Sequence, residues 1–431
     1  MSGMVSMMKI LADLVPLNRV ICSSDYDQTI DYLAAVLPFK VIEYSSGDDY
    51  NGWVIPPKWD VKKAEITRNG QLVYDGMRHP LAVIALSRSF KGRVDREDLR
   101  THLHYDHRYD DSIAFHFRQL FRSWQRDWGF CVPKTLYDSL APGEYAVTIE
   151  TEESDGVLRM LELTHPGQLD ETIVFGANLD HPGVANDGMS GVVVGMELFR
   201  RLAARATKFT YKLVLAQGII GSEYYLGKQS KEDRDRIMEG VFLEMLGSDT
   251  QLALQASRDG SSNIEYAVGR ALKDGGASFR AGPFESIILN DEYIWEAYGV
   301  PMASLSRFPY PEYHSERDNL ALMREPRLLE AVDVLERAVE ILERSVLVRK
   351  KFEGNVCLSN PRYDLYVDPG QIAFGEAPSH ERKQMRLLMD LIPTLTKPVT
   401  SRALAERVGL PEEQVSGYLA RWAEKGLVEM R

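Results

Sequence analysis

An apolar β-type segment that runs into an acidic loop and then a helix is the feature that most constrains this chain. The segment Glu171-Thr-Ile-Val-Phe175 precedes a loop with Asp180, His181 and Asp187, and a helix with a small, apolar face begins at about Ser190. Such a strand–loop–helix unit is typical of an α/β sheet. An imidazole and carboxylates that converge in one turn are suitable ligands for a divalent cation. The same residues also suit a plain turn with solvated acids that caps the helix.

Strand and helix patterns alternate from residue 170 to residue 345. A helical pattern at 191–204 is followed by strand-like segments at 211–216 and 240–245, and a long helical pattern covers 326–347. Parallel strands need crossover connections, which are usually helices. The alternation therefore predicts a mostly parallel sheet flanked by helices, with functional residues at the carboxyl ends of its strands.

The segment before this alternation has a different residue pattern. Residues 45–104 contain short β-prone pieces, among them 81–86, separated by Asn-Gly, Asp-Gly and proline turn signals. They predict a β-rich insertion in a main domain formed by residues 1–44 and 105–350. Residues 96–128 are predicted to be mainly helical.

The tail of the chain has the pattern of a separate unit. After a linker at 351–380, residues 381–431 contain three helical patterns and a β-like end, which predicts a winged helix-turn-helix. The helix that would contact DNA in such a unit begins with Glu412 and Glu413, and these acids would repel the DNA phosphates. We therefore expect no nucleic-acid partner, and a docking role, such as in a homo-oligomer, is at least as well supported.

Composition narrows the class of protein further. A chain of 431 residues exceeds one usual hydrophobic core, and a net charge of −12 argues against nucleic-acid or anionic-membrane surfaces. The three scattered cysteines provide no disulfide framework. No apolar run approaches the ~18–20 residues of a membrane span. The sequence thus predicts a cytoplasmic protein without a membrane partner.

Two later segments place acids beside apolar runs. Glu244 interrupts the apolar segment 241–247, and a carboxylate buried there needs a cation or an ion pair, unless the strand is an exposed edge. Asp291 and Glu292 follow another apolar stretch, where they either contact a ligand or begin a helix.

A third segment, the loop at 306–320, combines a histidine with charged and aromatic residues. His314, with Asp318 nearby to orient it, has the form of a metal ligand and its supporting carboxylate. A loop histidine without a metal is the alternative. Arg307 and Tyr310 are candidates for binding a substrate or its oxyanion.

A rival metal motif lies earlier in the chain. His102-Leu-His-Tyr-Asp-His107 matches the HxHxDH signature of metallo-β-lactamase-fold hydrolases. That signature should follow a strand and be joined by later histidines, whereas this segment reads as a charged helix and loop. We therefore interpret it as a solvated histidine cluster, or as a wall of a substrate pocket.

Four motifs occur in the order found in the M28-type zinc exopeptidases, which this chain resembles: ANDGMSG (185–191), GIIGSEYY (218–225), LEMLG (243–247) and YHSERDNL (313–320). The resemblance is closer to the bacterial, aminopeptidase-like DUF4910 proteins, which have an inserted DUF2172 segment and a C-terminal winged helix. It spans essentially the whole chain and rests on Pro16–Arg19, Trp53–Trp59, His79–Leu81, Trp128–Pro133, His181–Pro182, Asn290–Glu292 and Pro311–His314. It implies an M28-type α/β sheet that binds a catalytic metal pair.

The resemblance implies a role for each matching residue. Asp187 matches the carboxylate that bridges both metals, Glu244 the ligand after the next strand, and His314 the late histidine ligand. The usual His-x-Asp loop reads Asn178-Leu-Asp180 here, so His181 is the candidate for the missing imidazole.

The resemblance also shows what the chain lacks. Where the peptidases carry two glutamates before the Gly-Ser turn, one of them the general base, this chain has Gln217-Gly218. General-base catalysis typically contributes about 10²–10⁴ in rate. Glu223 and Asp180 are therefore the candidate catalytic acids, with a surface-helix glutamate as the alternative for Glu223.

The sequence thus predicts a metal-dependent, aminopeptidase-like hydrolase. It would cleave an amide or peptide bond in a small amino-acyl or peptide-like substrate, and the resemblance favours a biosynthetic one. The expected ligands of one or two zinc ions, or of another divalent metal, are His181, Asp187, Glu244 and His314, and the expected substrate contacts are Arg307, Tyr310, Asp291 and Glu292. The alternative is a catalytically impaired peptidase fold that binds a ligand or regulates, using its winged helix to contact a partner or DNA.

Overall fold

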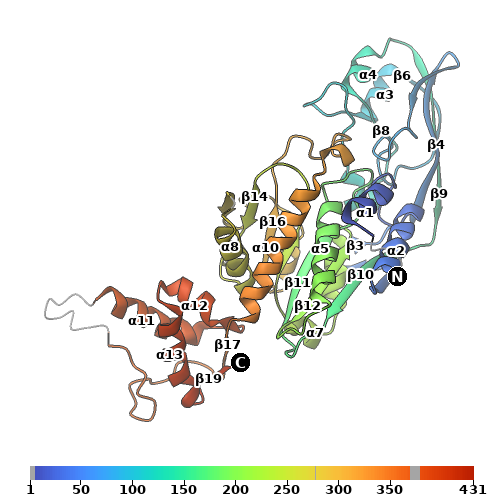
Figure 1. The fold of residues 1–431 in the computed structure, drawn as a ribbon. Helices are drawn as coiled ribbons and strands as arrows, with labels where there is room; N and C mark the ends of the chain where they lie inside the picture. Colours follow the sequence, from blue (N-terminus) through green and yellow to red (C-terminus); the bar gives the residue numbers. More distant parts are fainter. Residues whose placement is uncertain (1–4, 277, 369–378) are drawn as a thin grey trace.

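The structure is a computed structural model that describes residues 5–276, 278–368 and 379–431. Figure 1 shows three parts in a row: a small sheet, a large central sheet with helices on both sides, and a C-terminal group of helices. Within the described ranges, no helix is both long enough and apolar enough to cross a membrane.

The central sheet has eight strands, and its middle four run parallel. In spatial order they are β1 (Lys40–Ser45), β10 (Val157–His165), β12 (Thr210–Ala216), β11 (Thr172–Asn178), β13 (Ile237–Leu243), β16 (Met302–Ser306), β14 (Leu252–Gln255) and β15 (Phe279–Gly282). The pairs β1–β10, β10–β12 and β14–β16 are antiparallel. The predicted mostly parallel α/β sheet is confirmed.

Helices cover both faces of this sheet, so its central strands are mostly apolar. All seven residues of β11 are buried; Ile173 and Phe175 face one core and Val174 faces the other. The first core is covered by α1 (Met7–Leu14), α2 (Ser24–Val36), α5 (Met189–Leu202), α8 (Asn263–Asp274) and α10 (Glu325–Glu343). The second is covered by α6 (Ile220–Gly227), α9 (Glu292–Ala297) and the small sheet, while α7 (Lys231–Arg236) leads into β13. Burial on both faces explains why these strands show no polar alternation.

The small sheet is antiparallel and draws on two stretches of chain. Its order is β5 (Gln71–Asp75), β4 (Lys58–Arg68), β9 (Glu144–Ser154) and β6 (Phe90–Asp95). It therefore takes strands from both sides of the expected domain boundary at 104. Around it lie β2 (Asp49–Tyr50), β3 (Trp53–Val54), β7 (Leu103–His104), β8 (Phe130–Cys131), α3 (Arg96–Thr101) and α4 (Lys134–Ser139).

Two local predictions in this region are wrong. Residues 96–128 are not mainly helical, because α3 is followed by the short strand β7 and by irregular chain with two 3-10 turns, η1 (Arg118–Phe121) and η2 (Ser123–Gln125). Residues 81–86 form no strand, although every one of them is buried. In both places the apolar residues are used for packing between distant segments, and this tertiary demand overrides local propensity.

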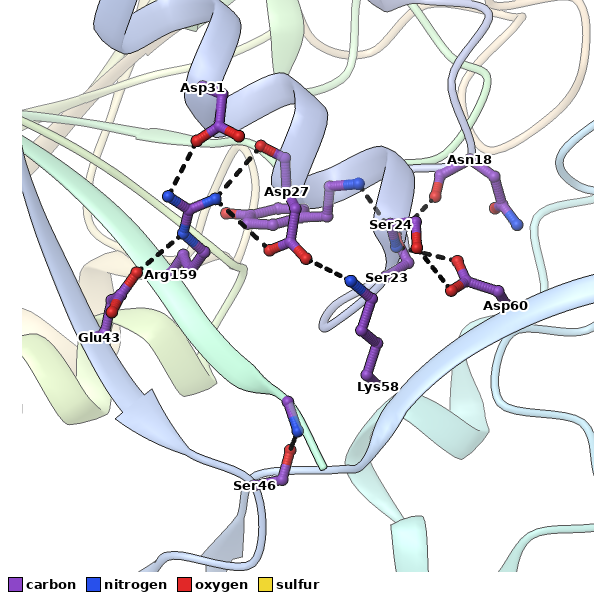
Figure 2. A network of polar contacts seen from close by, with 12 residues as sticks. Asn18, Ser23, Ser24, Asp27, Asp31, Glu43, Ser46, Lys58, Asp60 and Arg159 are labelled. Atoms are coloured by element: carbon purple, nitrogen blue, oxygen red, sulfur yellow. Dashed lines mark hydrogen bonds and ion pairs between the residues drawn. The ribbon is translucent and has the colours of Figure 1, made fainter. Parts of the chain in front are cut away.

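A polar network around α2 joins the two sheets (Figure 2). Arg159 on β10 contacts Asp31 at 2.9 Å and Glu43 at 3.0 Å, and it lies 3.6 Å from Asp27. Asp27 also pairs with Lys58 of β4 at 2.7 Å. Because the Arg159 side chain is only 15% exposed, these pairs are screened less than ordinary surface pairs. The network fixes α2 where the small and central sheets meet.

The C-terminal part combines three helices with a small sheet. The helices are α11 (His380–Leu391), α12 (Ser401–Val408) and α13 (Glu412–Glu424), and the 3-10 turns η3 (Leu320–Leu322) and η5 (Ile392–Thr394) lie before α10 and after α11. In the sheet, β17 (Leu347–Lys350) lies between β18 (Val399–Thr400) and β19 (Val428–Met430). The winged-helix assignment stays a prediction, and residues 369–378 of the expected linker lie outside the described residues.

A buried hydrogen-bond chain attaches this C-terminal part to the central sheet. The carboxylate of Glu239 on β13 accepts hydrogen bonds from the amides of Asn263, at 2.8 Å, and Ile264, at 2.7 Å. The Asn263 side-chain oxygen in turn accepts one from the backbone amide of Thr400 at 2.6 Å. Burial raises the pKa of Glu239 to about 7. Asn263 therefore carries a buried polar contact between the two parts, in addition to the hydrogen bonds from Lys397 to the Ile237 and Met238 carbonyls.

Asn263→Ala should destabilise the protein by about 1–3 kcal/mol, because it leaves the buried Thr400 amide without its acceptor. Arg270→Ala is the matched control on the same helix, where only an exposed pair with Asp274 is lost and about 0.5 kcal/mol or less is expected. Thermal unfolding of the two variants measures the difference. Equal midpoints for both would contradict the interpretation.

Candidate metal centre

The candidate site lies at the carboxyl ends of neighbouring parallel strands. The loop after β11 carries Asp180, His181 and Asp187, Glu244 directly follows β13, and His314 lies in the loop after β16. Loops at this edge of a parallel sheet meet in space, because all the strands end on the same side. The topology thus brings together residues that are up to 134 positions apart in the chain (Asp180 to His314).

Three of these residues converge on one point. His181, Asp187 and His314 each offer a ligand atom, and these atoms all lie within 4.8 Å of one another. Asp187 Oδ2 is 3.1 Å from His314 Nε2 and 3.6 Å from His181 Nε2. Across the described ranges, this is the one group of three such residues that could bind a metal ion.

The donor atoms of this group suit a cation. Asp187 Oδ2 is buried and makes no hydrogen bond, and its nearest polar neighbours are the two imidazoles, at 3.1 and 3.6 Å. The other ring nitrogen of His181, Nδ1, faces Asp180 Oδ1 at 3.5 Å. Two imidazoles and a carboxylate are a common ligand set for zinc. The residues therefore fit a divalent metal ion.

The charges of the group are complementary. Burial lowers the pKa of His181, but the carboxylates of Asp187 and Asp180 outweigh it and raise the pKa to about 9. Burial raises the pKa of Asp187, and the two histidines outweigh it and lower the pKa. The carboxylate of Asp187 is therefore ionised, as a metal ligand must be.

Asp318 holds the Asp187 loop in place. Its carboxylate accepts hydrogen bonds from the backbone amides of Ala185, Asn186 and Asp187, at 3.2, 2.6 and 3.0 Å. The Tyr310 hydroxyl donates a further one at 2.6 Å. Asp318 thus orients the loop of Asp187, whereas the sequence suggested that it would orient His314.

Arg19 supports the same loop from behind. It is fully buried, and its guanidinium donates hydrogen bonds to the carbonyl oxygens of His181 and Val184 and, on its other side, of Leu14 and Val15. Burial lowers its pKa to about 10. Arg19 therefore ties the loop of His181 to the end of α1.

Aromatic rings surround His314. Tyr313 stacks on its imidazole with centroids 3.8 Å apart, and Phe115 and Phe117 approach it edge-on at 5.2 and 5.3 Å. Phe115 also contacts the His181 ring at 5.4 Å. His314 has a φ of 54°, a conformation that is uncommon for a residue other than glycine and is concentrated at functional sites.

Glu244 lies beside the group but outside it. It is fully buried, its Oε2 accepts a hydrogen bond from the Asn290 side-chain amide, and its Oε1 has no partner. Burial and the neighbouring Glu292 raise the pKa of Glu244 well above its usual value. Met245, the next residue, has a φ of 52°. Glu244 is thus a buried carboxyl with one free oxygen.

The comparisons with known proteins agree with this geometry. The family model described as a domain of unknown function, DUF4910, matches residues 8–345. The chain belongs to the DUF4910 family. A family relative from Clostridium acetobutylicum, described provisionally as a polysaccharide biosynthesis protein with an aminopeptidase-like domain, is 25% identical over 327 residues, which is 75% of this chain and 74% of the relative.

Solved structures share the fold. A Clostridium acetobutylicum protein described provisionally as a peptidase is 20% identical, with a TM-score of 0.75 over 99% of this chain and 96% of its own. A zinc aminopeptidase from Bacillus subtilis is 13% identical, with a TM-score of 0.59 over 78% and 95% of the two chains. An M28 peptidase precursor from Shewanella amazonensis is 15% identical, with a TM-score of 0.55 over 78% and 92%. The DUF4910 chain therefore has an aminopeptidase-like, M28-type fold.

Hydrogen bonds engage Asn178, Asp180 and Gln217, the residues that the resemblance aligns with other ligands and the base of the peptidases. The Asn178 amide donates to the Asn290 side-chain oxygen at 3.1 Å, and the Gly218 amide donates to Asp180 Oδ1 at 3.0 Å. Gln217 donates its side-chain amide to the Arg159 carbonyl at 3.0 Å. These polar groups are thus engaged with one another or with backbone.

The remaining candidate residues are not brought to the three-residue group. Glu223 Oε1 accepts hydrogen bonds from Asn51, at 3.0 Å, and from the Tyr298 hydroxyl, at 2.8 Å. The buried Arg307 donates to the Leu246 and Thr250 carbonyls and pairs with Glu330 at 2.6 Å. These hydrogen bonds and this ion pair hold Glu223 and Arg307 within the fold, away from the three-residue group.

The acids of the Asn290–Glu292 motif are also buried. Both oxygens of Asp291 accept a hydrogen bond from the Ile219 amide, at 2.9 and 3.0 Å, and Glu292 accepts one from the Asn290 amide at 3.0 Å. Burial raises the pKa of Asp291 to about 6 and that of Glu292 to about 7. Neither side chain is exposed enough to contact a substrate directly.

The rival histidine motif forms no metal group. His102 stacks on Trp128 with centroids 3.8 Å apart, and His104 lies against His116 at 4.1 Å. The described residues in this segment do not appear in the group of ligand atoms above. The chain just beyond it, however, supplies Phe115 and Phe117 to the metal centre.

Asp318→Asn should weaken zinc binding about 10- to 100-fold, because the loop of Asp187 loses its charged acceptor. Tyr310→Phe removes one hydroxyl from the same carboxylate and should have a smaller effect. Competition with a chromophoric chelator measures both affinities. An Asp318→Asn protein that binds zinc as tightly as the wild type would show that the loop does not need this support.

Proposed function

We propose that this DUF4910 protein is a hydrolase that uses one divalent metal ion, zinc, to cleave an amide bond. The observation that carries the proposal is the convergence of His181, Asp187 and His314, where the Nε2 atoms of both histidines face the buried Oδ2 of Asp187. Structural neighbours that include a zinc aminopeptidase support it. A bound zinc ion would act as a Lewis acid on the substrate carbonyl and would activate water.

The hydrogen bonds around the centre support one ion rather than two. The Asn178 side-chain amide donates a hydrogen bond to the Asn290 side chain, and Asp180 accepts a hydrogen bond from the Gly218 amide. The amide of Asn178 also replaces the imidazole of the peptidase pattern, and an amide is a weaker zinc ligand. A second ion would have to displace these contacts without gaining a histidine.

Glu244 is the carboxylate that we propose as the proton acceptor. Its Oε1 is buried and unpaired, whereas its Oε2 is fixed by Asn290. A buried carboxylate with a raised pKa is a better base near neutral pH than an exposed one. This role differs from the ligand role that the sequence suggested, and it replaces Glu223, which is engaged by Asn51 and Tyr298.

The substrate that fits this proposal is a small amino-acyl or peptide-like molecule. The aminopeptidase-like neighbours support an amide next to an amino terminus, and the relative linked to polysaccharide biosynthesis supports a biosynthetic role. The second candidate is a ligand-binding or regulatory protein without turnover. The engagement of Gln217 with the Arg159 carbonyl favours it, because the usual base is absent there.

The purified protein should contain about one zinc ion per chain by elemental analysis. Asp187→Ala and His314→Ala should lose it, and both should lose hydrolysis of aminoacyl anilides and dipeptides. His102→Ala, in the rival motif, is the control and should keep both. Zinc bound in His314→Ala but lost in His102→Ala would reject this centre.

Glu244→Gln should keep its zinc and lose about 10²–10⁴ in kcat, since the amide cannot accept the proton. Glu223→Gln is the matched control and should retain most of its turnover. Loss of zinc from Glu244→Gln would instead identify Glu244 as a ligand. Loss of turnover in Glu223→Gln alone would give the role of base to Glu223.

A further inference from the structure

A row of aromatic rings extends outward from the metal centre. Phe117 contacts the His314 ring at 5.3 Å, Phe121 lies 6.2 Å from Phe117, and Trp53 lies 6.2 Å from Phe121. Contacts at these separations are normal for packed aromatic pairs. Phe117 is nevertheless 38% exposed, although it adjoins a ligand of the candidate metal. The row therefore offers apolar surface to solvent next to the reacting position.

The segment that carries Phe117 is fixed to the ligand loop. The Phe115 amide donates to the His314 carbonyl at 2.9 Å, and Glu316 and Ile113 exchange backbone and side-chain hydrogen bonds at 3.0 and 3.2 Å. Ala114 forms a β-bridge with Ser315. Because these contacts bracket His314, the position of Phe117 relative to the metal ligands is set by backbone pairing.

Packing inside the protein does not explain why a phenylalanine lies partly exposed at position 117. Phe115, two residues earlier, is only 8% exposed and packs against both histidines, so it fills the space between the rings. Phe117 contacts the rings of Phe115 and His314 but leaves over a third of its surface in water. Isolated exposed apolar residues are common, but one joined to a row of rings at a polar site marks a binding surface.

We propose that Phe117 and Phe121 form a subsite that binds a bulky, ring-bearing apolar side chain of the substrate, beside the bond that is cleaved. The inference rests on the proposed hydrolase function and specifies its substrate class: amino-acyl groups with aromatic side chains. Edge-to-face contacts with a substrate ring would add to the area that it buries. A small side chain such as that of alanine would leave Phe117 exposed.

The test compares hydrolysis of L-phenylalanine 4-nitroanilide and L-alanine 4-nitroanilide by the full chain loaded with zinc. The wild type should prefer the phenylalanyl probe, and Phe117→Ala should lose about five- to tenfold of that preference in kcat/KM. Phe117→Leu should lose less, because it keeps an apolar side chain. Leu72→Ala, 61% exposed on β5, is the control that should keep the preference. All variants should bind the same amount of zinc.

A second measurement does not depend on turnover. Saturation-transfer NMR with L-phenylalaninamide should show strong transfer to the ring protons in the wild type and weaker transfer in Phe117→Ala, with or without zinc. Equal ring transfer in both proteins, or an unchanged preference between the two anilides, would overturn the subsite. If neither anilide is cleaved but ring transfer depends on Phe117, the subsite stands and the hydrolase proposal fails.

Discussion

Buried negative charge at the carboxyl edge of the central sheet is the constraint on which the rest of the site depends. Asp180, Asp187, Glu244, Asp291, Glu292 and Asp318 are all buried there. Carboxylates removed from water are costly unless they are paired, hydrogen-bonded or protonated. Hydrogen bonds from backbone amides stabilise Asp318 and Asp291, and the guanidinium of Arg19 brings positive charge. A divalent cation would complete the balance at Asp187.

The architecture of the main sheet could be predicted because its signals are local. Apolar strands and helical repeats from 170 to 345 can each be recognised within about ten residues, and their alternation implies a parallel arrangement. Residues 96–128 could not be predicted in this way. Ala114 pairs with Ser315, about 200 positions away, and no local period reports such pairing. The small sheet has the same difficulty, because β9 joins it from beyond the expected boundary.

The site was predictable where residue type alone carries the chemistry. Asp187 and His314 were recognisable because their motifs match a family pattern, and the structure brings them within 3.1 Å. The roles of Arg19 and Phe117 depend instead on which distant residues they contact in the fold. Arg19 reaches the His181 carbonyl across 162 residues, and Phe117 is an ordinary aromatic until the ligand loop pairs beside it. Arg307, a charged residue in the same loop, donates its hydrogen bonds to the Leu246 and Thr250 carbonyls, and the sequence gives no sign of these distant partners.

The position of β17, the middle strand of the C-terminal sheet, limits where the C-terminal part could be exchanged or lost in evolution. β17 begins at Leu347, with only residues 344–346 between it and the end of α10 at Glu343, and it lies just past the end of the family match at 345. The C-terminal part is therefore joined by a short turn rather than by a flexible tether. Exchange or loss of this part during evolution would have to break the chain near 346, upstream of the apparent linker. A cut at 381 would leave β17 without both of its neighbours.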